Sequence, residues 1–248
     1  MNVELVFETS WEVCNKVGGI HTVISTKALN LVNEFGDNYI LIGPDVWRED
    51  ITNPEFIPDD TLFVEWKIRA TNDGLRVKTG RWNIAGKPVV FLIDFTPYFG
   101  QQNEIFAKFW ETYNLDSITG QWDYVEPALF GYAAGKVIES FTSFFREHHN
   151  IIAQFHEWMT GTGILYIEKY TVEYKRSADS IGAPPIESDT RYTTIVIVPP
   201  AATGTSTVEV SSILVDLLRK DKYASDVTSG QYGYGTSYIN KVSLLTPE

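Results

Sequence analysis

The chain has 248 residues, which allows one large domain or two small ones. Hydrophobic residues make up 44% and aromatic residues 14%, enough for a sizeable core and too much for a disordered protein. The formal net charge of −12 argues against a nucleic-acid-binding protein, because phosphate backbones are bound through basic contacts.

The single cysteine and the N-terminal residues indicate the cellular compartment in which we expect the protein. Cys14 is the only cysteine, so no intramolecular disulfide can form, which suits a reducing environment. The N-terminal "MNVELVFETS" lacks the basic region and long apolar stretch of a signal peptide. No segment approaches the roughly 18 apolar residues of a membrane span. We therefore expect a soluble, cytoplasmic protein that binds neither membrane nor nucleic acid; the sequence leaves its oligomeric state open.

Apolar strands alternate with helical patterns over the first 170 residues. Between Ile20 and Phe35 apolar residues recur at helical spacing, "ALFGYAAGKVIESFTSFF" (128–145) reads as a helix with small residues on one side, and "TGTGILYIEKY" opens another helix. Such alternation predicts an α/β fold with a mainly parallel sheet covered on both faces. The predicted strands are 3–8, 38–43, 88–94 and 151–155.

The composition changes near residue 170. All tryptophans, phenylalanines and histidines lie at or before Trp158, whereas the remainder is rich in Ser and Thr. We predict a domain over 1–170, a linker over 171–191 that contains "KRSADSIGAPPIESD", and an unassigned small β/α segment over 192–248. In that segment "RYTTIVIVPP" reads as a strand and "STVEVSSILVDLLRKDKY" as a helix, which either complete the same sheet or form a separate appendage.

The loop "NKVGGIHTV" joins the first predicted strand to the first predicted helix. In an open parallel sheet, ligands bind beyond the carboxyl ends of the strands. Gly18 and Gly19 let the backbone approach a ligand, the first amides of a helix carry partial positive charge, and Lys16 adds a full charge. The motif is neither GxGxxG nor a Walker loop, so a structural turn is an equal alternative.

A second candidate site follows the strand at 151–155, in "QFHEWMTGTG". His156 and Glu157 come at the point where such a sheet presents side chains to a cleft, and we expect them to be exposed there. The sequence is not HExxH, because position 160 is threonine, so we predict no metal site. A lone histidine is more often structural, but the glycines that follow favour a ligand role.

Six segments, in chain order between about residues 3 and 169, together resemble the N-terminal region of glycogen synthases, in the branch shared by animal and fungal enzymes and some Bacteroides-like bacteria. The motifs "WEV.NKVGGI.TV" and "FHEW" make the resemblance specific. The segments are "FETSWEVCNKVGGIHTVISTKA", "NYILIGPDVW", "GRWNIAGKPVVFLIDF", "FWETY", "ALFGYAAGKVIESF" and "AQFHEWMTGTGILY".

The resemblance implies a GT-B glycosyltransferase, in which two Rossmann-like domains face each other across a cleft. Such enzymes transfer glucose from UDP-glucose to the non-reducing end of an α-1,4-glucan with retention, without a further cofactor. By the resemblance, Lys16, Gly18 and Gly19 face the phosphate and sugar side of the donor, His156 faces the transferred glucose as the catalytic residue, and Glu157 binds substrate beside it.

The sequence after Tyr170 departs from the family pattern. The family continues with a "TTHAT"-like strand, an arginine-bearing helix and a second domain with most nucleotide contacts and the acidic catalytic motif, and residues 171–248 resemble none of these. We therefore expect the isolated chain to be inactive. The alternatives are a non-catalytic module that binds glucan or nucleotide-sugar, and a fusion with an unrelated C-terminal interaction segment.

Overall fold

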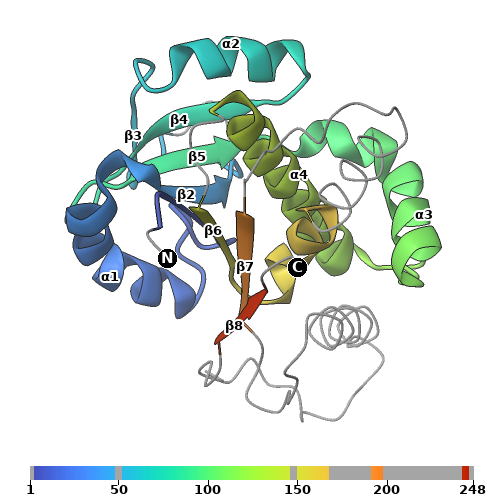
Figure 1. Ribbon diagram of the computed structural model, residues 1–248. Coiled ribbons are helices and arrows are strands. Elements are labelled where there is room, and N and C mark those ends of the chain that lie inside the picture. Colours follow the sequence, from blue (N-terminus) through green and yellow to red (C-terminus); the bar gives the residue numbers. More distant parts are fainter. Residues whose placement is uncertain (1–2, 48–51, 146–149, 168–190, 198–241, 246–248) are drawn as a thin grey trace, which may run out of the picture.

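One eight-stranded β-sheet organises the chain in the computed structural model (Figure 1), which describes residues 3–47, 52–145, 150–167, 191–197 and 242–245. The strands lie in the order β3-β4-β5-β2-β1-β6-β7-β8. Their bounds are β1 Leu5–Thr9, β2 Tyr39–Pro44, β3 Phe56–Pro58, β4 Val77–Trp82, β5 Val89–Ile93, β6 Asn150–Phe155, β7 Arg191–Ile197 and β8 Val242–Leu245.

The central strands are parallel and follow the Rossmann order. β1 pairs in parallel with β2 and β6, β2 with β5, and β6 with β7. In chain order this places the parallel strands as 3-2-1-4-5, with the direction of the connections reversing between β1 and β6. Antiparallel pairs β3–β4 and β4–β5 extend one edge, and β7–β8 extends the other. All four predicted strands and the mainly parallel Rossmann-like α/β fold are confirmed.

Helices connect the strands and cover both faces of the sheet (Figure 1). Strand residues alternate between two hydrophobic clusters, because successive side chains on a strand point to opposite faces. One cluster joins Val6 and Leu41 to the α1 residues Ile24 and Ala28. The other joins Phe7 and similar strand residues to α2, α3 and α4. The helices are α1 Ile20–Phe35, α2 Val64–Asn72, α3 Gln102–Tyr113 and α4 Trp122–Phe144, with 3₁₀ turns η1 Gly36–Asn38, η2 Thr96–Gln101 and η3 Trp158–Thr160.

The small residues of α4 allow a close approach to the helical residues 161–167 that follow η3. A Cβ on Gly131 would lie 3.0 Å from the carbonyl oxygen of Thr160, and one on Gly163 would lie 2.7 Å from the carbonyl oxygen of Gly131. The predicted small-residue side of this helix is therefore a helix-packing surface. The predicted start of the helix is wrong, since α4 begins at Trp122 and carries Pro127 inside it.

The segment after residue 170 contributes backbone to the same sheet. β7 continues the parallel pairing beyond β6, and β8 lies antiparallel beside it. These two strands therefore extend the same sheet and do not form a separate appendage. The linker up to residue 190 and the helix predicted from "STVEVSSILVDLLRKDKY" lie outside the described residues. None of the helices among the described residues combines the length and the apolar composition of a membrane-spanning segment.

Candidate functional site

The two candidate segments meet at the carboxyl ends of β1 and β6. These strands pair with Thr9 opposite Phe155, and the backbone amide of His156 donates to the carbonyl of Thr9 at 3.0 Å, one residue past the end of β6. The connections reverse direction between these two strands, so a crevice opens there in folds of this class. The tertiary structure thus brings His156 next to the base of the loop that carries Lys16.

The loop from Ser10 to Gly19 folds back over the end of the sheet. Val13 is buried against β2, where a Cβ on Gly43 would lie 2.6 Å from the Val13 carbonyl oxygen. Beyond this anchored part Lys16, Gly18 and Gly19 are exposed. The candidate binding residues therefore stand at the accessible tip of a loop whose base is fixed.

The carboxylate of Glu12 closes this loop on α1. Its Oε2 atom accepts hydrogen bonds from the backbone amides of Gly18 at 2.8 Å and His21 at 2.9 Å. Gly19, the N-cap of α1, has no side chain to cap the helix, so Glu12 takes that role and places its negative charge at the positive end of the helix. The backbone amides of Gly18 and His21 thus already have an anionic partner in the Glu12 carboxylate.

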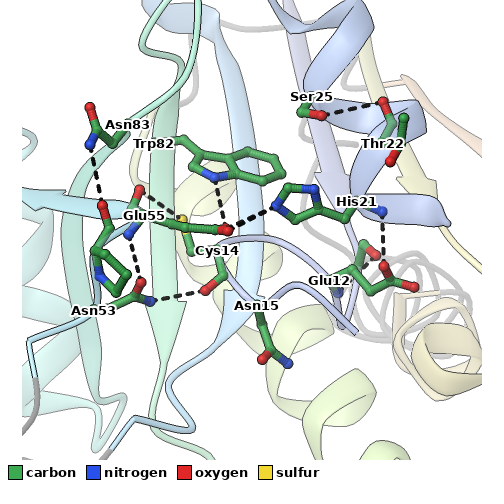
Figure 2. Close-up of polar contacts among 12 residues, drawn as sticks. Glu12, Cys14, Asn15, His21, Thr22, Ser25, Asn53, Glu55, Trp82 and Asn83 are labelled. Carbon is green, nitrogen blue, oxygen red and sulfur yellow. Dashed lines mark hydrogen bonds and ion pairs between the residues drawn. The ribbon is translucent and has the colours of Figure 1, made fainter. Parts of the chain in front are cut away.

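A second set of polar contacts ties the loop to the chain before β3 (Figure 2). Asn53 donates from Nδ2 to the Cys14 carbonyl at 2.9 Å. The Glu55 carboxylate lies 3.0 Å from His21 Nε2 and accepts from Trp82 Nε1 at 3.2 Å. Burial, reinforced by the Glu55 carboxylate, raises the pKa of the Cys14 thiol, so this thiol is held in its unreactive form.

Glu8 is a fully buried carboxylate near the end of β1, and three donors surround it. His156 Nε2 lies 2.5 Å and Lys27 Nζ 2.7 Å from its Oε1 atom, and the Tyr39 hydroxyl donates to its Oε2 atom at 2.5 Å. Burial by itself raises the pKa of a carboxyl group, but here the hydrogen bond from His156, together with the charge and hydrogen bond of Lys27, outweighs it and lowers the pKa of Glu8 to about 2. Glu8 is therefore ionised at neutral pH.

His156 is only 3% exposed, which contradicts the expectation that it projects freely into a cleft. Its hydrogen bond with buried Glu8 is the reason, since a buried carboxylate requires partners. Replacing His156 should therefore destabilise the protein, because Glu8 would lose a buried hydrogen-bond partner.

Three side-chain polar atoms in the described ranges are buried without a hydrogen-bond partner, and all three lie at this edge of the sheet. They are Oγ1 of Thr9, at the end of β1, and Nδ1 of His156 and Nε1 of Trp158, which follow β6. Buried polar groups are normally paired, so each of these atoms marks a place at the carboxyl ends of β1 and β6 where a ligand or water can complete the structure.

Glu157 is exposed beside this group and has a strained backbone. Its φ of 59° and ψ of 180° lie in a region that glycine alone adopts readily. Partial desolvation, followed by the repulsion of Glu12, raises the pKa of its carboxyl group. Among the described residues, no group of three His, Cys, Asp or Glu side chains could hold a metal ion.

Comparisons with known proteins identify the family of the chain. A family model described as "Glycogen synthase" matches residues 8–176, more than half of the chain. The chain belongs to the glycogen synthase family. Relatives include a rat protein named "Glycogen [starch] synthase, liver", 37% identical over 162 residues (65% of this chain and 23% of the relative). The Neurospora crassa "Glycogen [starch] synthase" is 31% identical over 170 residues, 68% of this chain and 24% of the relative.

The match to the family is confined to one part of each protein. The chain spans about a quarter of the length of the curated relatives, including the Saccharomyces cerevisiae "Glycogen [starch] synthase isoform 2" at 30% identity, where 25% of the relative is covered. The matched part contains the loop after β1, the pair Glu8 and His156, and Glu157.

Sequence reasoning missed three residues of this site within the family region, namely Glu8, Lys27 and Tyr39. One signal pointed to Glu8: a charged residue directly follows the apolar run "LVF" (5–7) in a predicted buried strand. A carboxylate in a buried strand must be paired, so its presence predicts a basic or hydroxyl partner on a neighbouring element. The identity of those partners depends on the tertiary structure.

Proposed function

We propose that this chain forms the N-terminal, Rossmann-like half of a GT-B glycosyltransferase active site. The reaction is transfer of glucose from UDP-glucose to the non-reducing end of an α-1,4-glucan, with retention. Membership of the glycogen synthase family supports this reaction. The observation that carries the proposal is the group of unpaired buried polar atoms of Thr9, His156 and Trp158 at the crevice between β1 and β6.

In this proposal His156 and Glu157 contact the transferred glucose, and the loop with Lys16, Gly18 and Gly19 lies toward the phosphates. A sugar offers hydroxyl groups that donate to or accept from imidazole and carboxylate groups, whereas the diphosphate is attracted to the Lys16 ammonium. Lys16→Ala should weaken the binding of an anionic donor by about 1.5–3 kcal/mol, the scale of a charge-assisted hydrogen bond. Because the amides of Gly18 and His21 are engaged by Glu12, the Lys16 ammonium carries most of this attraction.

We also propose that the chain alone turns over UDP-glucose poorly. Stabilising a leaving nucleotide requires donors on both sides of the phosphates, and the family match ends at residue 176. The deciding measurement is saturation-transfer NMR of UDP-glucose with the pure chain, combined with a coupled turnover assay. We expect saturation to reach the glucose protons more strongly than the uridine protons, with glucan extension at background level.

Variants make this measurement specific. Lys16→Ala should weaken the signal of the whole ligand, and His156→Gln should reduce the glucose signal preferentially. Lys108→Ala, which removes an exposed ammonium paired with Glu104 on α3, should change neither. Saturation confined to the uridine would contradict the placement of glucose at His156, and robust glucan extension would overturn the need for a second half. Glucan binding without any UDP-glucose signal would favour a non-catalytic binding module.

A further inference from the structure

The hydrogen bonds around Glu8 determine which nitrogen of His156 carries a proton. An ionised carboxylate only accepts hydrogen bonds, so the short contact between Glu8 Oε1 and His156 Nε2 requires a proton on Nε2. Gln154, whose amide nitrogen lies 3.4 Å from the same ring atom, is a weaker neighbour, and its amide can turn its oxygen toward that proton.

The charge balance of the cluster opposes a second proton on the ring. Glu8 contributes one negative charge, and the Lys27 ammonium, which reaches the same Oε1 atom from α1, already neutralises it. A doubly protonated His156, 3% exposed, would leave an excess positive charge in a buried site, which is costly. Tyr39 donates a neutral hydroxyl to the other oxygen and does not change this balance.

We infer that Glu8 is a positioning residue that holds His156 as the neutral Nε2–H tautomer and so presents Nδ1 as a hydrogen-bond acceptor. This inference rests on the proposed function and specifies which atom of His156 contacts the sugar. The buried, unpaired Nδ1 atom accepts from a hydroxyl of the transferred sugar, and its lone pair disfavours contact with a phosphate oxygen. Glu8 itself touches no ligand and acts through the imidazole.

Nitrogen-15 NMR of the imidazole rings in the full chain tests the tautomer without any ligand. The chain has four histidines, and His156→Gln identifies the signals of His156 by their loss. At neutral pH we expect a protonated Nε2 and an unprotonated Nδ1. A proton on Nδ1, alone or together with Nε2, would overturn the inference, whatever the activity of the protein.

Variants of Glu8, Lys27 and Tyr39 test whether Glu8 sets the tautomer of His156 or only fills space beside it. Glu8→Met keeps the volume but removes the acceptor, so the ring should become a mixture of tautomers; a single Nε2–H tautomer in this variant would overturn the role of Glu8. Lys27→Met removes a neighbouring charge but leaves Glu8 as the acceptor for Nε2–H, so the tautomer should stay Nε2–H; loss of the Nε2 proton in this variant would overturn the role of Glu8. Glu8 and Gln154 contact the ring, and Glu157 lies close enough to interact with it by charge. Lys27 and Tyr39 contact Glu8 and act on the ring through it.

Tyr39→Phe is the matched control, because Tyr39 binds the Glu8 oxygen that His156 does not contact, and the tautomer should be unchanged. If Glu8→Met fails to fold, the tautomer of His156 in the unaltered protein still decides the question, since a proton on Nδ1 there would overturn the inference. Addition of UDP-glucose should shift the Nδ1 resonance without protonating it, and UDP should leave it in place. Protonation of Nδ1 by UDP would show a phosphate contact and overturn the hydroxyl assignment.

Discussion

The carboxylate of Glu12 accepts a hydrogen bond from the backbone amide of His21 at 2.9 Å, so the loop after β1 closes on the helix that it introduces. The same carboxylate oxygen accepts from Gly18. An internal anion therefore occupies the amides that a strand-to-helix turn often offers to a phosphate. In this protein the loop is organised before any ligand arrives.

Removing this cap should cost stability and expose the amides. We expect Glu12→Ala to lower the free energy of unfolding by about 0.5–2 kcal/mol, as measured by urea denaturation, because a helix N-terminus loses its acceptor. The affinity for inorganic pyrophosphate should increase in calorimetric titration. Glu104→Ala, in the first turn of α3, is the control for loss of an exposed glutamate. Unchanged pyrophosphate binding would show that Glu12 does not compete with an anion.

Glu8 should make stability depend on acid pH. Its pKa is lowered from 4.5 to about 2, so the folded state binds fewer protons than the unfolded state within this window. The stabilisation is present above pH 4.5 and is lost as the pH falls toward 2. Its size is roughly 2–4 kcal/mol.

Urea unfolding at a series of pH values measures this effect. Glu8→Gln should be less stable than the unaltered protein at neutral pH and should show a flatter decline in acid. Glu34→Gln, on the exposed surface of α1, should retain the full acid dependence. Parallel acid profiles for the Glu8 variant and the unaltered protein would mean that Glu8 is not the titrating group.

Backbone strain at Glu157 predicts a stabilising substitution. Glycine tolerates the observed φ of 59°, so Glu157→Gly should raise the free energy of unfolding by about 1 kcal/mol, after the greater freedom of glycine in the unfolded chain is subtracted. Glu157→Gln removes the charge but keeps the strain, and the difference between the two variants isolates the backbone term. If the glycine variant is no more stable than the glutamine variant, the strain is absent.

The close packing of α4 on residues 161–167 predicts a position that does not tolerate a methyl group. A Cβ on Gly131 meets the Thr162 hydroxyl and the Thr160 carbonyl, so Gly131→Ala should destabilise the protein by about 1–3 kcal/mol in thermal or urea unfolding. Gly100→Ala serves as the control, since no atom lies within 4 Å of its added Cβ. Equal stability of the two variants would contradict the close approach.

Features with a local periodic pattern followed from the sequence. The strands β1, β2, β5 and β6 are apolar runs, and α1 shows helical spacing, so their existence and approximate bounds were predictable. The start of α4 was not, because Pro127 normally marks a helix boundary and here lies in the second turn. β3 and β4 were missed because one is three residues long and the other mixes polar and apolar residues.

The candidate site was likewise predictable in part from local sequence and in part only from the tertiary structure. The motifs alone located the loop of Lys16 and the strand end of His156, since both follow recognisable strands. Only the tertiary structure decided that His156 is buried against Glu8, 148 positions earlier in the chain, and that Tyr39, 31 positions from Glu8, completes the carboxylate's partners. Hydrophobic periodicity is a property of neighbouring residues and can be read locally. The pairing of a buried charge depends on which strands become neighbours in the sheet, and that is settled only when the whole sheet assembles.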